Sequence, residues 1–173
     1  MFERYTEKAR RTIFFGRYEA SQFGSPCIES EHLLLGLLRE NKALANQFLQ
    51  LGLVESIRKQ VEDLTLPGEK VSTSIDLPLS SECKRILVYA AEEADKLSHK
   101  FIGTEHLFLG VLREQGCLAA KLLAERGVTL KVVREQIGSN PPEEFSSAPK
   151  SPGLPAGYRS HRLLYNKAAA ARV

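Results

Sequence analysis

The chain contains the stretch Glu31-His32-Leu33-Leu34-Leu35-Gly36-Leu37-Leu38-Arg39-Glu40 and repeats it as Glu105-His106-Leu107-Phe108-Leu109-Gly110-Val111-Leu112-Arg113-Glu114. Eight of these ten positions are identical, and the two copies lie 74 residues apart. A match of this length at one offset indicates an internal duplication. Most leucines of the two copies must fill a core, because each small helical unit has few other large apolar residues.

The segment before each copy matches at the same offset. Small or apolar residues recur there at steps of four, three, four and three, which places them on one stripe of a helix. The two matching sets are Ala9, Ile13, Gly16, Ala20 and Phe23, and Cys83, Leu87, Ala90, Ala94 and Leu97.

Each copy is predicted to form four helices. The expected ranges are 6–23, 31–40, 43–50 and 55–64 in the first copy, and 80–98, 105–114, 118–126 and 130–137 in the second. Side chains able to cap a helix start support most of these: Thr6, Ser30, Ser80, Thr104 and Thr129. Helix exits are predicted at Gly24, Gly52 and Gly127. The sequence therefore predicts an all-α fold, a pseudo-twofold double four-helix repeat of eight helices.

The chain divides into four segments. Pro67-Gly68 and Pro78 interrupt helix between the copies, and five of the eight prolines lie between Pro141 and Pro155. We expect a first repeat, an inter-repeat linker, a second repeat, and a flexible Pro-rich linker with a basic tail, at residues 1–64, 65–79, 80–140 and 141–173.

Charge is distributed unevenly along the chain. The formal net charge is +3, but the residues from Phe145 onward hold five basic side chains and no acidic one. The first 144 residues therefore carry 19 basic and 21 acidic residues. Because a nucleic-acid-binding face is strongly basic, we do not expect the body to bind nucleic acid. Binding through the basic tail is the alternative, and it predicts salt-sensitive affinity that is lost with the tail.

The remaining composition favours a cytoplasmic protein with no membrane partner. No apolar run approaches the roughly 20 residues that span a bilayer, and the first residues lack the apolar stretch of a secretory signal. Cys27, Cys83 and Cys117 are an odd number at unrelated spacings. They fit free thiols in a reducing compartment.

At this point the residues resemble a known family. The pattern Phe2-x-Arg4-Tyr5-Thr6-Glu7-Lys8-Ala9, the stretch from Ser30, and Ile102-Gly103-Thr104-Glu105-His106 are similar to the N-terminal domain of Clp-type AAA+ unfoldases, the ClpC-like branch above all. The resemblance covers about residues 2–140. It implies a domain on top of an ATP-driven hexameric ring, which recruits adaptor proteins and substrate proteins for unfolding and for delivery to the ClpP peptidase.

The motor itself is not encoded here. The chain has no Gly-x-x-x-x-Gly-Lys-Ser/Thr loop to cradle nucleotide phosphates, so we expect no ATP hydrolysis and no cofactor. The leading interpretation is a non-catalytic substrate- or adaptor-binding domain of a ClpC-like unfoldase. A free-standing regulator that docks on a Clp machine or its clients is the alternative within the same class.

In ClpC-like members this domain resembles a reader of arginine-phosphorylated proteins. A carboxylate at a helix start can accept a guanidinium, and first-turn amides beside a basic side chain suit a phosphate. The resemblance thus implies a phosphoarginine site made of Thr6, Lys8, Arg10, Glu31, Ser80, Lys84 and Glu105. The plainer alternative is that Glu31 and Glu105 only complement the helix dipole and that the basic side chains are solvated.

Two departures from the family pattern weaken phosphate recognition. The second copy keeps Gly103-Thr104 before its glutamate, whereas the first has Glu29-Ser30. At the start of the fifth helix, Glu82 stands where the family tends to have a basic residue. Each extra carboxylate opposes a phosphate by like-charge repulsion.

His32 and His106 suggest metal binding or acid–base catalysis at first sight. Neither has a second ligand at a usual spacing, so we interpret both as structural and expect no metal site. A small helical enzyme that uses them with Glu31 and Glu105 stays as the third hypothesis, and no catalytic residue is assigned. Phe14 flanks the apolar stripe and is the best candidate for an exposed apolar contact.

Overall fold

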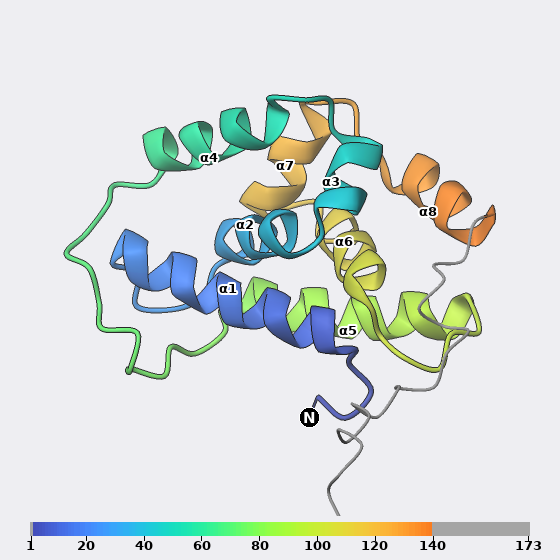
Figure 1. Cartoon of the computed structure of the whole chain (residues 1–173), viewed down its shortest axis with the longest axis horizontal. Coiled ribbons are helices and arrows are strands. Elements are labelled where there is room, and N and C mark those ends of the chain that lie inside the picture. The colour runs from blue at the N-terminus through green and yellow to red at the C-terminus, as the bar shows by residue number, and fades with distance from the viewer. Residues whose placement is uncertain (1, 140–173) are drawn as a thin grey trace, which may run out of the picture. The chain divides into compact units, whose positions relative to one another are not determined.

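The computed structural model describes residues 2–139, so the tail expected at 141–173 lies outside the described residues. The described part holds eight helices in two successive groups of four (Figure 1). The first group is α1 (Glu7–Phe23), α2 (Ser30–Glu40), α3 (Lys42–Phe48) and α4 (Leu53–Leu64). The second is α5 (Ser81–Lys96), α6 (Thr104–Arg113), α7 (Leu118–Ala124) and α8 (Leu130–Ser139). The predicted all-α double repeat is confirmed.

Helix starts follow the predicted caps at three places and depart from them at two others. The Thr129 hydroxyl accepts the Val132 N–H at 3.5 Å, at the start of α8. The Thr6 hydroxyl accepts the Ala9 N–H, and the Ser80 hydroxyl accepts the Cys83 N–H, each at 3.2 Å. Ser30 and Thr104 were predicted as caps, but they lie inside α2 and α6. The caps are Glu29 and Gly103. The backbone N–H of each donates to the histidine three residues further along, His32 or His106, so each helix starts one residue earlier than predicted.

The fourth helix of the first copy starts earlier than expected, at Leu53. Gly52 caps it with φ 87°, and no side chain takes part. A left-handed backbone at this position suits glycine, which has no Cβ to clash. Gly24 and Gly127 also have positive φ, and Gly24 ends α1 as predicted.

The two copies of the repeated decapeptide form the centre of the molecule. α2 and α6 lie between the other helices, and every residue from Ser30 to Leu38 and from Thr104 to Leu112 is buried. The backbones of α1 and α2 touch where they cross: a Cβ added to Gly36 would lie 2.5 Å from the Thr12 carbonyl oxygen. Gly110 meets the Ile86 carbonyl oxygen of α5 in the same way.

Buried carboxylates fasten the last helix of each repeat to its first. Glu19 of α1 accepts two hydrogen bonds from Arg58 of α4, at 2.7 and 3.0 Å. Glu93 of α5 accepts two from Arg134 of α8, at 2.8 and 2.9 Å. The duplication therefore extends to its ion pairs.

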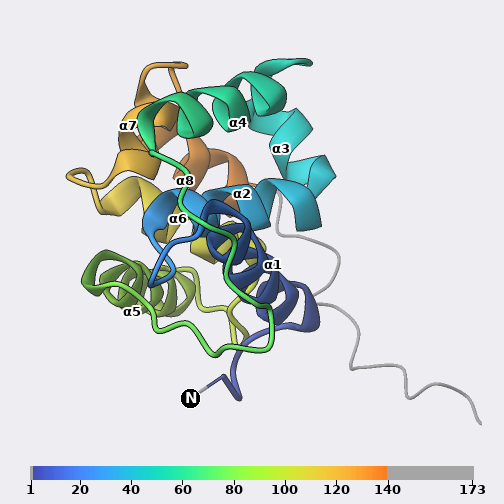
Figure 2. The same ribbon diagram turned by 90° about the vertical axis from the view of Figure 1, so that its left-hand side faces the viewer.

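The segment between the repeats runs along α1, as Figure 2 shows. Gly68 N–H donates to the Phe23 carbonyl at 2.9 Å, and Val71 N–H donates to the Ser21 carbonyl at 3.0 Å. Arg17 then holds the segment through Asp76, at 3.1 Å. Among residues 2–139, no helix has the length and apolar character needed to cross a membrane.

Candidate functional site

Two backbone crossovers join the starts of helices from different repeats. Thr6 N–H donates to the Ile102 carbonyl at 3.0 Å, and Ile102 N–H donates to the Arg4 carbonyl at 2.7 Å. The start of α1 therefore lies beside the start of α6. Ser80 N–H donates in the same way to the Ile28 carbonyl at 3.0 Å, which places the start of α5 beside that of α2.

The seven predicted site residues consequently fall into two groups. We call the first group, Thr6, Lys8, Arg10 and Glu105, the α1–α6 site. The second group, Glu31, Ser80 and Lys84, is the α2–α5 site. Each site takes its hydroxyl cap from one repeat and its carboxylate from the other, so the geometry sets the predicted acid and the predicted anion-binding helix start next to each other.

The carboxylates of both sites are more enclosed than solvated helix-terminal acids. Glu31 is 7% exposed and accepts a hydrogen bond from the Ser30 hydroxyl at 3.2 Å. Glu105 is 6% exposed and lies over Gly103, where an added Cβ would collide with its carboxylate. Glycine at that position therefore makes room for the acid.

The α2–α5 site is strongly acidic. Burial raises the pKa of Glu31, and the neighbouring charges of Glu29 and Glu82 raise it further. The thiol of Cys27 donates to the Glu29 carboxylate at 3.0 Å. Lys84 is the basic member of this site and is exposed, so a phosphate entering here meets three carboxylates.

The α1–α6 site holds more positive charge. Lys8 and Arg10 follow the capped start of α1, and the Arg10 guanidinium folds back to the Phe2 carbonyl at 3.2 Å. Arg4 lies close by but is bound to Asp95 at 2.6 Å. This site combines one enclosed carboxylate with a basic helix start.

The two histidines of the repeat act as helix caps. His32 Nδ1 accepts the Glu29 N–H at 3.1 Å, and His106 Nδ1 accepts the Gly103 N–H at 2.8 Å. Burial lowers the pKa of each ring to about 4. Both rings are therefore neutral near pH 7, and burial is the largest cause of the lowered pKa in each.

His106 belongs to a group of potential metal ligands that the sequence did not indicate. Among the described residues, the ligand atoms of His99, Glu105 and His106 lie within 4.8 Å of one another. Because His106 Nδ1 accepts a backbone N–H, its proton resides on Nε2, which lies 2.9 Å from His99 Nδ1. The two rings thus share a proton in a hydrogen bond, and a cation on Nε2 would have to displace it.

The cysteines are poorly suited to nucleophilic chemistry. All three are free thiols. Burial raises the pKa of Cys83 to about 12, and burial together with Glu29 raises that of Cys27 to about 11. Since the thiolate is the reactive form, neither residue is activated near neutral pH.

An apolar groove runs between α1 and the inter-repeat segment. Its lining includes Phe2, which precedes the start of α1, and Ile28, which precedes the start of α2. Its volume is about 490 Å³. Phe14 lines the groove and is 61% exposed, which confirms the expected exposure of this side chain, while its contact with a partner stays a prediction. Sequence reasoning missed the opposite wall, because the segment between the repeats was predicted only as a linker. The groove is lined by Phe2, Arg10, Ile13, Phe14, Arg17, Ile28, Asp76, Leu77 and Leu79.

Comparisons with known proteins point to one family. A family model described as the Clp repeat (R) N-terminal domain matches two overlapping segments, residues 4–125 and 79–172. The chain is 40% identical over 154 residues to the negative regulator of genetic competence ClpC/MecB of Bacillus subtilis. It is 39% identical over 146 residues to the chaperone protein ClpB of Oceanobacillus iheyensis. These matches cover 86% and 81% of this chain but only 18% of either relative.

Solved structures agree with this. The N-terminal domain of the Clp-associated chaperone ClpD from Arabidopsis thaliana is 28% identical, with a TM-score of 0.61, over 78% of this chain and 92% of that one. The N-terminal domain of Hsp104 from Candida albicans is 16% identical with a TM-score of 0.62, over 78% of this chain and 89% of that one, which shows a shared fold.

Proposed function

Because this chain belongs to the Clp repeat N-terminal domain family, whose domains are non-catalytic, we propose that it binds substrate or adaptor proteins for a ClpC-like unfoldase. The observation that carries the proposal is the apolar groove beside the starts of α1 and α2. Phe14 exposes a large aromatic face there, and exposed aromatic side chains beside an apolar groove are typical of protein-binding sites.

Charge supports the same assignment. Arg10 and Arg17 both line the groove, which is otherwise mostly apolar, and Arg17 is paired with Asp76 at 3.1 Å. A partner segment can therefore place an apolar side chain against Phe14 and its polar groups on the rim.

In the assembled machine the captured protein would pass to the ATPase ring and then to the ClpP peptidase. The free thiols fit a cytoplasmic location.

The groove is tested with a permanently unfolded protein, fluorescein-labelled casein, by fluorescence anisotropy on the full chain. We expect Phe14→Ser to weaken binding about fivefold or more, because it removes the exposed aromatic contact. Val88→Ser is the matched control, because Val88 holds the corresponding position of α5, is 57% exposed and lies outside the groove. Equal losses in both variants, or none in either, would remove the groove from the proposal.

We further propose that the α1–α6 site reads phosphoarginine. The enclosed carboxylate of Glu105 would accept the guanidinium, while Lys8 and the capped start of α1 would hold the phosphate. The α2–α5 site would bind it more weakly, because Glu29 and Glu82 repel the phosphate. Exposed Lys84 does not balance these charges.

Titration with free phosphoarginine, followed by amide NMR, tests this site. We expect shifts at Thr6 and Glu105, their loss in Glu105→Ala, and their retention in Glu31→Ala. Arginine and inorganic phosphate, added separately, show whether both halves of the ligand are needed. If phosphoarginine at millimolar concentration causes no shifts, the proposal of phosphoarginine recognition is wrong. The proposal for the Phe14 groove is tested separately, by the casein assay.

A further inference from the structure

The arginine in the last turn of the second helix of each repeat has a different environment in the two copies. Arg113 in the second copy contacts Glu92 at 2.7 Å and Glu93 at 3.1 Å, and its side chain is 20% exposed. Arg39 holds the corresponding position in the first copy. Its nearest carboxylate is Glu19, at 4.0 Å, and its side chain is 47% exposed.

One substitution distinguishes the surroundings of Arg39 from those of Arg113, since Glu19 and Glu93 are each bound twice by the arginine of the fourth helix. The position that corresponds to Glu92 is occupied by Tyr18, which offers a ring in place of a carboxylate. Both oxygens of Glu19 already accept hydrogen bonds from Arg58. Among residues 2–139, Arg39 donates no hydrogen bond to any side chain or carbonyl group. Its five N–H donors are therefore available to a ligand.

Aromatic stacking keeps this guanidinium in place. The Arg39 guanidinium carbon lies 4.4 Å from the centre of the Phe15 ring and 5.1 Å from that of Tyr18. A guanidinium held against aromatic faces loses little further freedom when it binds an anion. Arg39 is thus oriented before any ligand arrives.

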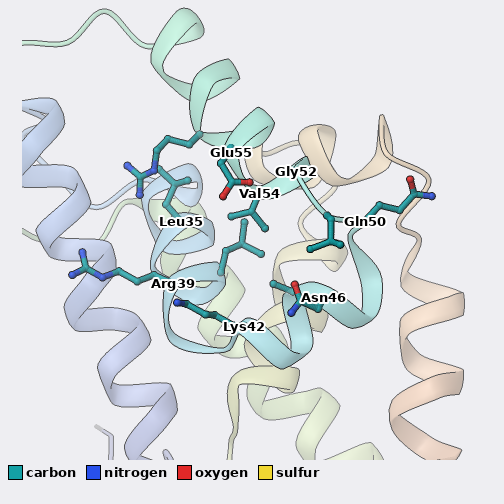
Figure 3. Close-up of a pocket in the computed structure, with 12 residues that line it drawn as sticks. Leu35, Arg39, Lys42, Asn46, Gln50, Gly52, Val54 and Glu55 are labelled. Carbon is teal, nitrogen blue, oxygen red and sulfur yellow. The ribbon is translucent and has the colours of Figure 1, made fainter.

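A cavity of about 330 Å³ opens beside Arg39, between the end of α2, α3 and α4 (Figure 3). Leu35 and Val54 contribute to its apolar wall. Arg39 and Lys42 lie on one side of the cavity in Figure 3, and Glu55 extends from α4 on the other. The cavity therefore joins an aliphatic interior to a rim that carries Arg39 and Lys42, and within residues 2–139 no carboxylate lies closer to the Arg39 guanidinium than Glu19, at 4.0 Å.

The corresponding cavity of the second repeat lacks this rim. It has about 320 Å³ and lies between α6, α7 and α8, but no arginine lines it. Gly116 stands at the position that corresponds to Lys42. Lys121 is its basic lining residue. Arg113 stacks on Tyr89 at 4.4 Å, as Arg39 does on Phe15, but Arg113 does not line the second cavity, so the first repeat alone combines a cavity-lining guanidinium with a lysine.

We propose that this cavity docks a short acidic segment of a partner protein, with an aliphatic side chain inside and an adjacent carboxylate on Arg39. The planar guanidinium matches a carboxylate in a two-bond fork, and Lys42 adds a second positive charge. Arg58 also lines the cavity, but Glu19 neutralises it, so Arg39 is the anion receptor.

This docking surface is distinct from the sites described above. The start of α2 contributes Glu31 to the α2–α5 site, and its other end contributes Arg39, eight residues or about 12 Å further along the helix axis. A partner seated on Arg39 leaves the helix starts and the Phe14 groove open. The inference adds to the proposed protein-binding function and does not depend on phosphoarginine recognition.

The test uses the full ¹⁵N-labelled chain and a blocked peptide, acetyl-Gly-Asp-Leu-Glu-Gly-amide, with acetyl-Gly-Asn-Leu-Gln-Gly-amide as its uncharged match. We expect the acidic peptide alone to shift the amides of Arg39, Lys42 and Val54. Arg39→Gln should weaken it roughly tenfold, because a charged two-bond contact is lost. Arg39→Lys, which keeps the charge without the fork, should lie between the two.

Lys121→Gln is the matched control and should leave the affinity unchanged, because it removes the basic residue of the second cavity. Equal binding of the two peptides, or equal affinity in Arg39→Gln and the parent, would overturn the proposal, as would the absence of any shift with the acidic peptide. Casein binding and phosphoarginine shifts should be unaffected by Arg39→Gln, so failure here is distinguishable from failure of the proposed function.

Discussion

Arg134 donates two hydrogen bonds, of 2.8 and 2.9 Å, to the buried carboxylate of Glu93 and thereby ties α8 to α5. Burial would raise the pKa of Glu93, but the hydrogen bond and charge of Arg134, together with Lys96, outweigh it and lower that pKa. Arg113 adds a further contact at 3.1 Å. Glu93 therefore stays charged inside the second repeat.

Removing this carboxylate should loosen α8. We expect Glu93→Ala to reduce the free energy of unfolding by about 2 kcal/mol or more, because several charge-assisted hydrogen bonds disappear. Glu19→Ala should cost less, since Arg58 alone binds Glu19 closely. Urea unfolding measures both, and hydrogen exchange should accelerate in α8. A larger loss in Glu19→Ala would contradict the ranking.

The crossing of α1 and α2 leaves no room for a methyl group at Gly36. We expect Gly36→Ala to destabilise the fold by about 1–3 kcal/mol, although alanine favours an isolated helix by roughly 1 kcal/mol. Thermal unfolding followed by circular dichroism checks the sign. Gly116→Ala serves as the control, because an added Cβ there meets no atom within 4 Å. Stabilisation by Gly36→Ala would contradict the close packing.

Asn41 links the two repeats and caps a helix. Its Oδ1 accepts the Leu44 N–H at 3.0 Å at the start of α3, and its Nδ2 donates to the Thr104 hydroxyl at 2.8 Å. Asn41→Ala should therefore cost about 1–2 kcal/mol. Gln115, at the corresponding position of the second copy, is exposed, and Gln115→Ala should be nearly neutral in the same urea titration. Similar effects of the two substitutions would argue against the cap.

Acidification should weaken the fold through His106. Burial, the nearby His99 and the charge of Arg4 lower its pKa to about 4, although Glu93 acts in the opposite direction. Between this value and the ordinary pKa of about 6.5, the unfolded chain binds a proton that the folded chain does not. Stability is therefore fully present above about pH 6.5 and falls by up to about 1.4 kcal/mol per pH unit on acidification, until pH reaches about 4.

His106→Gln separates this effect from other titrations, because glutamine can still accept the Gly103 N–H without taking up a proton. We expect the parent to lose about 2 kcal/mol more than the variant between roughly pH 7 and pH 5. Urea unfolding at the two pH values measures the difference, and the raised pKa of Glu31 cancels in the comparison. Parallel pH dependence in both chains would contradict the assignment.

The helices could be predicted because the duplication repeats the same helical spacing of apolar residues in both copies. Residues of the Leu33–Leu38 run are buried as expected, and Phe14 is exposed as expected. The starts of α2 and α6 were each misplaced by one residue, because a serine or threonine before a glutamate is a strong cap pattern. The reciprocal bond from His32 or His106 overrides that local preference.

The pairing of the helix starts could not be predicted in the same way. Alignment of the copies matches Thr6 with Ser80 and Glu31 with Glu105, but it carries no information about which start faces which. That choice follows from the Thr6–Ile102 and Ser80–Ile28 backbone contacts, which join residues far apart in sequence. The cavity beside Arg39 was missed for a similar reason, since α2, α3 and α4 enclose it only once they have packed together.

The crossed backbone contacts also bear on how such a protein diversifies. A single repeat would contain only half of each site. Two identical repeats that pair about a twofold axis would form two identical sites. Once both are encoded in one polypeptide, a substitution alters one site and spares the other. Glu29 and Glu82 add negative charge to the α2–α5 site, whereas Gly103 gives the Glu105 carboxylate its place in the α1–α6 site, so a single gene can carry two different sites.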